Sequence, residues 1–167
     1  MGVFAADKLI SEARRLASEY RKATGRPLAG ITNEVAVFDA ARLLDLEPVK
    51  GSAGGYDAVG RGPREGRRIQ IKGRAIFDEN KHGQRIGQLK LNQDWDSVML
   101  VLMDEEFGPY EIYEAQRDDI LACLEESGNT KRANRGAMTV AKFKIISELV
   151  WTREGGVEED EVWVNHQ

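Results

Sequence analysis

Two segments near the beginning of the chain place apolar residues at the spacing of an amphipathic helix. In residues 3–24 the apolar positions recur every three or four residues, and Gly25 follows where a helix can end. In residues 32–44 the same spacing follows Thr32, a residue type that caps helices well. The pattern therefore predicts two helices, the first of which occupies residues 1–30 together with its connection.

The middle of the chain changes to the patterns of β-strands. Residues 97–103, S-V-M-L-V-L-M, form an unbroken apolar run of strand length, which predicts a central strand buried on both faces. The segments 46–56 and 76–92 lack a sustained period and are interpreted as loops, the second with room for a short helix or strand. Three further short strands are predicted at residues 56–59, 68–74 and 110–113.

Helical periodicity returns towards the end. Residues 116–126 predict a helix that the following Ser-Gly-Asn closes. Residues 138–150 fit a helix capped by Thr139, although Ile145, Ile146 and Val150 leave a strand as the alternative. The acidic tail, residues 155–167, either frays or adds a short edge strand at 162–164.

The order of these elements is helix, helix, four strands, helix, helix. This order predicts an α/β fold, a mixed β-sheet core flanked by helices. A chain of 167 residues is the length of one domain with a core of its own, so residues 1–167 are predicted to form a single domain.

Composition and motifs argue against a membrane-spanning, a secreted or a nucleotide-binding protein. No apolar run approaches the about 18 residues of a membrane span, and the first residues lack the apolar region of a secretory signal, so a cytoplasmic protein without a membrane partner is expected. The Gly60-x-Gly62 motif has no P-loop lysine and no following helix, so no nucleotide cofactor is predicted.

The predicted hairpin within residues 54–74 contains most of the candidate catalytic residues. Strand side chains alternate between faces, so Gln70 and Lys72 share one face while the flanking isoleucines face the core. Asp57 opens the hairpin, and Glu34 lies in the first turn of the preceding helix. Taken one by one, these residues also suit a turn, a helix start and an exposed strand face.

Together the four residues suit metal-assisted hydrolysis of a phosphodiester. Such a reaction uses a divalent cation to lower the pKa of bound water, with oxygen ligands and a nearby cationic side chain. Glu34, Asp57 and Gln70 are the candidate ligands of Mg²⁺ or Mn²⁺. Lys72 is the candidate that orients the attacking water or stabilises the transition state, so all four are candidate catalytic residues.

The helical Glu, the Asp opening a hairpin and the Q-x-K triplet resemble the PD-(D/E)XK nuclease superfamily, with its restriction endonuclease-like fold. G-G-Y-D-A-V-G and R-I-Q-I-K-G-R are similar to Mrr-like restriction enzymes and Holliday-junction resolvases. The resemblance implies a metal-dependent DNA endonuclease acting in restriction, repair or defence, and a homodimer for double-strand cleavage. The alternative is a catalytically inactive nuclease-fold module that binds nucleic acid or a protein. Because Gln70 replaces a carboxylate, a weak or single-metal site is expected in place of a tight two-metal one.

Basic residues are concentrated around this motif. The whole chain has a net charge of −4, yet residues 61–90 contain nine basic and three acidic residues, a local +6. Such a cluster either neutralises DNA phosphates or is merely solvated. The candidate DNA-binding residues are Arg61, Arg64, Arg67, Arg68, Arg74, Lys81, Arg85 and Lys90.

Overall fold

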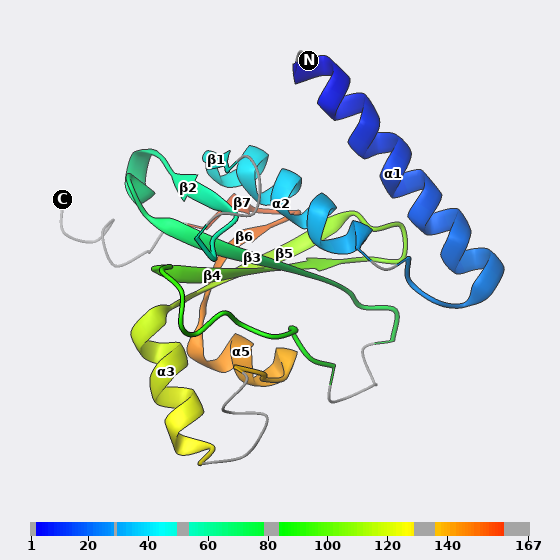
Figure 1. Cartoon of the computed structure of the whole chain (residues 1–167). Helices are drawn as coiled ribbons and strands as arrows, with labels where there is room; N and C mark the ends of the chain where they lie inside the picture. The colour runs from blue at the N-terminus through cyan, green and yellow to red at the C-terminus, as the bar shows by residue number, and fades with distance from the viewer. Residues whose placement is uncertain (1–2, 29, 50–53, 79–83, 129–135, 159–167) are drawn as a thin grey trace.

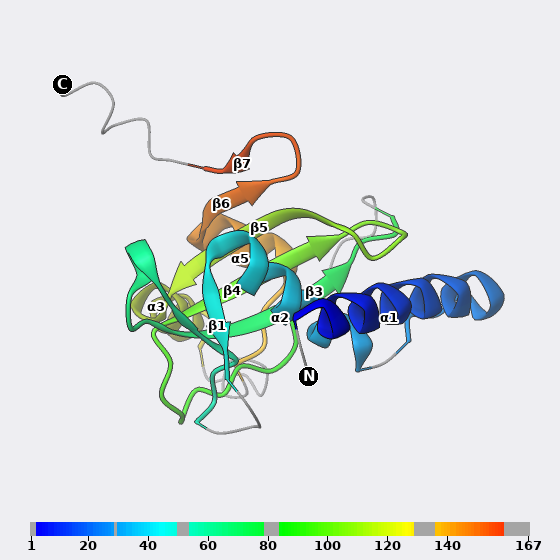
Figure 2. The same cartoon turned by 90° about the horizontal axis from the view of Figure 1, so that it is seen from above.

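A computed structural model shows a curled, mixed β-sheet with helices on both faces (Figure 1). It describes residues 3–28, 30–49, 54–78, 84–128 and 136–158. Within these residues, α2 covers one face of the sheet with α1 packed beside it, and α3 and α5 lie on the other face (Figures 1 and 2). The α/β class and the mixed sheet flanked by helices are therefore confirmed.

The sheet has seven strands in the described residues, and each strand lies beside its neighbours in sequence. All neighbouring pairs are antiparallel except β3 and β4, which are parallel. The strands are β1 (Leu46–Pro48), β2 (Ala58–Gly60), β3 (Arg68–Ala75), β4 (Ser97–Met103), β5 (Pro109–Gln116), β6 (Glu148–Thr152) and β7 (Gly156–Val157).

The helices follow the predicted periodicity closely. They are α1 (Val3–Thr24), α2 (Ile31–Leu44), α3 (Arg117–Glu126) and α5 (Val140–Ile146), with a 3₁₀ turn at Gly62–Arg64. The predicted cap of α5 is confirmed, because the Thr139 side chain accepts a hydrogen bond from the Lys142 amide. The predicted cap of α2 is wrong: Gly30, at φ 87°, precedes the helix, and Thr32 lies inside it. A positive φ suits glycine and lets the chain turn into the helix two residues earlier.

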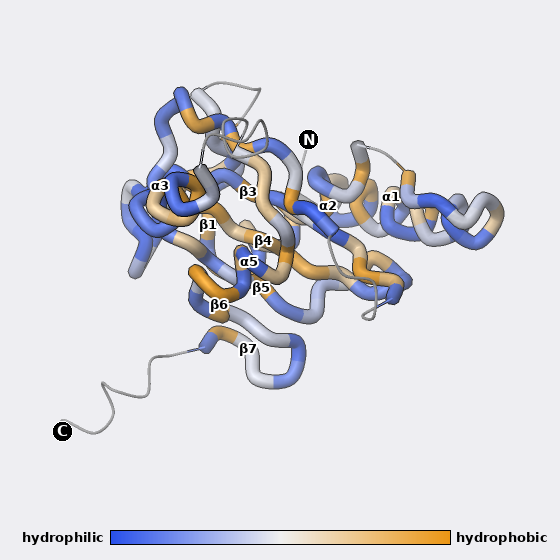
Figure 3. The backbone as a smooth tube through the Cα atoms, turned by 90° about the horizontal axis from the view of Figure 1, so that it is seen from below, coloured by the Kyte–Doolittle hydropathy of each residue, from blue (hydrophilic) through white to orange (hydrophobic). Residues whose placement is uncertain are grey.

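The central strand is the best predicted element. All seven residues of β4 are buried, as the apolar run indicates (Figure 3). Met99, Val101 and Met103 join the core beneath α2, while the alternate residues of β4 join the core shared with α3 and α5. A strand buried on both faces therefore links the two halves of the hydrophobic core.

Three strands were not predicted as such. β1 lies in the segment expected to be a loop, and it pairs with β2 at the edge of the sheet. The last predicted helix is divided: α5 ends at Ile146, and β6 then pairs with β5, with Trp151 opposite Ile112. Both interpretations of residues 138–150 are thus correct in part. β7 follows a tight turn after β6, and the proposed strand at 162–164 lies outside the described residues.

Gly73 allows α2 to lie close against β3. A Cβ at this position would lie 2.7 Å from Ala36 Cβ and 2.8 Å from the Thr32 carbonyl oxygen. Gly73→Ala is therefore expected to lower the free energy of unfolding by about 1–3 kcal/mol, because backbone and helix must move apart. Denaturant unfolding measures the change. Gly108→Ala is the matched control, since the atoms nearest to its new Cβ are flexible side-chain ends; equal stability of the two variants would contradict this close packing.

Candidate active site

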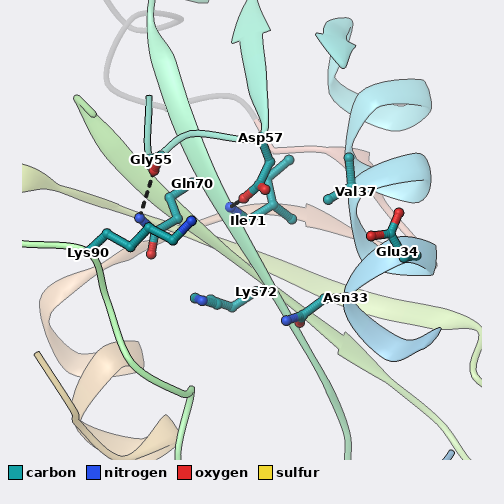
Figure 4. Close-up of a pocket in the computed structure, with 9 residues that line it drawn as sticks. All are labelled: Asn33, Glu34, Val37, Gly55, Asp57, Gln70, Ile71, Lys72 and Lys90. Carbon is teal, nitrogen blue, oxygen red and sulfur yellow. Dashed lines mark hydrogen bonds between the residues drawn. The ribbon is translucent and has the colours of Figure 1, made fainter. Parts of the chain in front are cut away.

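One pocket lies where β2 leaves the edge of β3 and α2 begins to cross it (Figure 4). Its volume is about 220 Å³. It brings together Glu34 from α2, Asp57 from the residue just before β2, and Gln70 and Lys72 from β3, with a lysine from the loop after β3. The lining residues are Asn33, Glu34, Val37, Gly55, Asp57, Gln70, Ile71, Lys72 and Lys90.

Asp57 is fixed across the hairpin by hydrogen bonds at both ends. Its amide donates to the Ile69 carbonyl at 2.8 Å, and its Oδ2 accepts from the Ile71 amide at 2.7 Å. β2 pairs with β3 only as far as Ile69, so the Ile71 amide would otherwise lack a partner strand. The carboxylate therefore caps the open edge of β3 and at the same time faces the pocket.

Asn33 accepts a hydrogen bond from the same open edge of β3, two residues after the amide that Asp57 binds. Its Oδ1 accepts from the Gly73 amide at 2.8 Å, which ties the first turn of α2 to the strand. Apart from its position next to Glu34, no pattern in the sequence singles out this residue, because its partner is set by how α2 packs on the sheet. Its side-chain NH₂ remains available as a donor in the pocket.

Gln70 contributes a buried amide with one unused acceptor. The residue is 2% exposed, and its Nε2 donates to the Gly55 carbonyl at 2.9 Å. The Gly55 oxygen fixes the orientation of the amide, because a flipped amide would oppose two acceptors. Within the described residues, Gln70 Oε1 is buried without a hydrogen-bond partner. A buried orphan acceptor is costly in a fold and points to a ligand that satisfies it.

Lys72 lies on the same face of β3, two residues further on. Burial lowers the pKa of its ammonium group below the usual value of 10.5. The negative charge of Asp57 opposes this shift, while the positive charges of Arg74 and Lys90 lower the pKa further. The strand thus presents a partly desolvated amine whose proton is held less tightly than that of a surface lysine.

Glu34 stands at the rim of the pocket. It is exposed on α2, and Figure 4 shows Val37 between it and Asp57. Lys90 enters from the opposite side, on the segment that follows β3, and its side chain extends over Gln70 in the same view. The hairpin residues therefore form the centre of the pocket, with one carboxylate and one lysine at its borders.

The oxygen donors suit a hard divalent cation. The described residues contain no group of three or more His, Cys, Asp or Glu side chains positioned for a metal, so a carboxylate-only cage is not present there. Two carboxylates and an amide oxygen remain, and the unpartnered Gln70 Oε1 is the acceptor that a cation would satisfy. The donor set fits a site with few charged ligands and therefore low affinity.

Three arginines of the predicted basic cluster, on the β2–β3 turn and the start of β3, bind other parts of the protein. Arg64 donates through Nε to Glu114 at 2.9 Å, and Glu114 also accepts from Ser97 in the sheet. Arg67 donates to the Asp96 carbonyl and the Gln116 side chain, while Arg68 pairs with Asp96. These contacts hold the β2–β3 turn onto the sheet.

The other candidate DNA-binding residues differ in their surroundings. Arg74 donates to the carbonyls of Arg85 and Gly73, and burial lowers its pKa. Arg61 is exposed beside Asp45 and Glu47 on the β1 side. Lys90 lines the pocket, Arg85 is half-buried, and Lys81 lies outside the described residues. Among the described members of the predicted cluster, Lys90 is therefore the one that lines the pocket.

Comparisons with known protein families and curated proteins do not indicate a function for this chain. No family model and no curated protein matches this chain. Within the described residues, no helix has the length and apolar character needed to cross a bilayer. What the protein does is therefore inferred from the side chains of its pocket.

Proposed function

We propose that the protein is a metal-dependent DNA endonuclease related to the PD-(D/E)XK superfamily. One observation carries the proposal: Asp57, Gln70 and Lys72 open from one hairpin into one pocket, where Gln70 Oε1 is buried without a partner in the described residues. A structural hairpin gains nothing from an unsatisfied amide oxygen beside a desolvated lysine. Both features are explained by a bound cation and an anionic substrate.

Each residue has a distinct role in this proposal. Asp57 and Gln70 would hold Mg²⁺ or Mn²⁺, with Glu34 approaching from the rim; the bound cation supplies water of lowered pKa. Lys72 positions the attacking water and stabilises negative charge that develops on the phosphate. Because burial lowers its pKa, Lys72 can also release a proton more readily than a surface lysine.

The surroundings of the pocket support DNA as the substrate. Lys90 adds a second cation beside Lys72, and the Asn33 side chain adds a neutral donor. Two lysines and an amide at one opening suit the phosphate backbone of a nucleic acid. A mixed sheet with helices on both faces is also compatible with a restriction endonuclease-like core.

Cleavage assays with a conservative variant test the proposal. The purified chain is incubated with single-stranded, duplex, branched and supercoiled DNA in Mg²⁺, Mn²⁺ or EDTA. We expect cleavage that requires the cation and falls about a hundredfold or more in Asp57→Asn. Asparagine keeps an acceptor for the Ile71 amide, so the melting temperature should change little. Failure of the wild type to cleave any of these substrates, or equal cleavage by Asp57→Asn, would reject the assignment.

A second candidate function is a nuclease-fold module that binds DNA without cutting it. The observation in its favour is that the Asp57 and Asn33 side chains already serve a structural purpose at the edge of β3, while Glu34 stays exposed. Salt-sensitive DNA binding without cleavage would identify this function. In that case Lys90→Ala should weaken binding, and the slope of log affinity against log salt should become shallower by about one.

Gln70→Glu should tighten cation binding while weakening the cation-free protein. A carboxylate adds ligand charge, but it removes the donor to the Gly55 carbonyl and buries a negative group. We expect the cation-free variant to lose about 1–3 kcal/mol of unfolding free energy. Melting temperatures measured during a MnCl₂ titration should rise at lower Mn²⁺ concentrations than for the wild type.

Gln70→Met is the matched control for this titration. Methionine also removes the hydrogen bond to Gly55 but offers no hard oxygen ligand, so Mn²⁺ should no longer raise its melting temperature. An equal response to Mn²⁺ in both variants would show that residue 70 does not contact the cation.

A further inference from the structure

Helix α1 is attached to the rest of the protein mainly by polar contacts along one face. Arg14 pairs with Asp39 at 2.9 Å, Ser18 donates to Glu106 at 2.8 Å, and Lys22 lies 3.3 Å from Glu106. Among the described side chains of α1, Ala17 is the buried apolar one. In Figure 1 the N-terminal half of the helix rises away from the sheet. The apolar residues of α1 are therefore mostly not used by the core.

Two leucines of α1 are left exposed in one stripe. Leu9 is 51% exposed and Leu16 is 54% exposed. They lie seven residues apart, which is two helical turns, so they project from the same side of the helix. Two large apolar side chains in register on a protruding helix are typical of a helix–helix contact.

A column of four charges runs beside these leucines. Its members alternate in sign, and all four are exposed: Lys8, Glu12, Arg15 and Glu19. They are spaced four, three and four residues apart, so they form one line along the helix, away from the face that contacts the sheet domain. None of them has an ion pair or hydrogen bond with a residue in the described part of the chain.

The four charges read +, −, +, − along the helix, so a second copy running in the opposite direction places a negative charge opposite each positive one. When two copies of α1 pair antiparallel with Lys8 opposite the partner's Glu19, Glu12 lies opposite the partner's Arg15. In this register Leu9 and the partner's Leu16 are offset by two residues, about 3 Å along the helix axis, so the two side chains still meet. Two-fold symmetry repeats both contacts, giving four opposite-charge pairs. A parallel pairing in register would instead place like charges together.

We propose that α1 is a homodimerisation helix that pairs antiparallel with the α1 of a second copy of this chain. The leucines supply the apolar contact, and the charge column selects the orientation. A single helix pair is smaller than a standard protein interface, so the dimer should depend on concentration and weaken with salt. This proposal is independent of the nuclease assignment, because it uses no residue of the pocket.

Sedimentation velocity over a range of protein concentrations tests the pairing. We expect a dimer in the wild type and a monomer in Leu16→Glu, with unchanged circular dichroism because Leu16 is exposed. Glu12→Arg and Arg15→Glu should each weaken association at least tenfold, since each creates like-charge contacts. The double variant Glu12→Arg/Arg15→Glu restores opposite charges across the axis, and its affinity should return to within about threefold of the wild type.

Matched controls come from α5. Ile145 is 83% exposed, and Ile145→Glu should leave the dimer unchanged, as should Lys142→Glu. A monomeric wild type would overturn the proposal. So would a dimer that survives Leu16→Glu, or a double charge reversal that associates no better than the single reversals, because either result places the interface elsewhere or in another orientation.

Discussion

Replacing Lys72 with methionine is expected to stop DNA cleavage while raising the thermal stability of the protein. Methionine has a similar shape without the ammonium group, so the pocket keeps its packing. Loss of a positioned acid–base or charge-stabilising group typically lowers rates about 10²- to 10⁴-fold. Stability should rise because the partly buried ammonium, whose pKa is lowered by desolvation, no longer has to be held in the fold.

The stability difference should depend on pH in a defined direction. The pKa of Lys72 is lower in the folded protein than in the unfolded chain, so the unfolded chain binds more protons between those two pKa values. Wild-type stability therefore gains from Lys72 as pH rises through its folded pKa towards 10.5. The advantage of Lys72→Met should be largest at neutral pH and shrink over that range.

Plasmid cleavage tests the predicted loss of activity, and melting temperatures of the same preparations test the predicted gain in stability. Lys142→Met on the exposed side of α5 is the control and should change neither. Cleavage by Lys72→Met within tenfold of the wild type would remove Lys72 from the mechanism. A lower melting temperature at neutral pH would show that the ammonium group stabilises the fold.

Arg14→Met is expected to lower the free energy of unfolding by about 3–5 kcal/mol. Asp39 is 0% exposed, and both of its carboxylate oxygens accept from Arg14, at 2.9 and 3.1 Å. Arg14 also donates to the Phe107 carbonyl at the β4–β5 turn. Without Arg14, the cationic partner that remains for the carboxylate in the described part of the chain is Arg42, a largely exposed side chain 3.8 Å away.

Chemical denaturation measures this loss, and two further variants interpret it. Arg14→Met/Asp39→Leu removes both charges and should recover part of the stability, because no unpaired buried carboxylate remains. Lys22→Met breaks an exposed pair with Glu106 and should cost at most about 1 kcal/mol. A loss from Arg14→Met no larger than that from Lys22→Met would contradict a structural role for the Arg14–Asp39 pair.

The centre of the candidate site could be predicted from the sequence. Strand alternation placed Gln70 and Lys72 on one face, and Ile69 and Ile71 are buried in the core as expected. Asp57 was expected at the opening of the hairpin, and it lies in the same pocket. The catalytic and metal-binding roles of these residues, and of Glu34, remain predictions.

The role of the arginines could not be predicted in the same way. From the sequence, Arg64 and Arg68 are predicted to contact DNA. In the structure Arg64 pairs with Glu114 and Arg68 pairs with Asp96, and both partners are distant in sequence. The spacing of long polar side chains along the chain does not indicate their ion-pair partners. Those partners are set only when the strands align in the folded sheet. For the same reason the sequence did not reveal that Asn33 binds the Gly73 amide.

Elements whose apolar residues repeat regularly could be predicted from the local pattern of the chain. α1 spans Val3–Thr24 as predicted, and β4 is the buried central strand. These features depend on local spacing, because a helix or strand turns a fixed angle per residue and burial selects one face.

Other features depend on contacts between segments that are distant in the chain. β1 and β6 exist because a neighbouring strand offers backbone partners, and α5 stops at Ile146 because β6 then pairs with β5. The lowered pKa of Lys72 and the orphan oxygen of Gln70 likewise arise from what packs around them. Desolvation and pairing are properties of contacts between distant segments, so no local pattern in the chain could specify them.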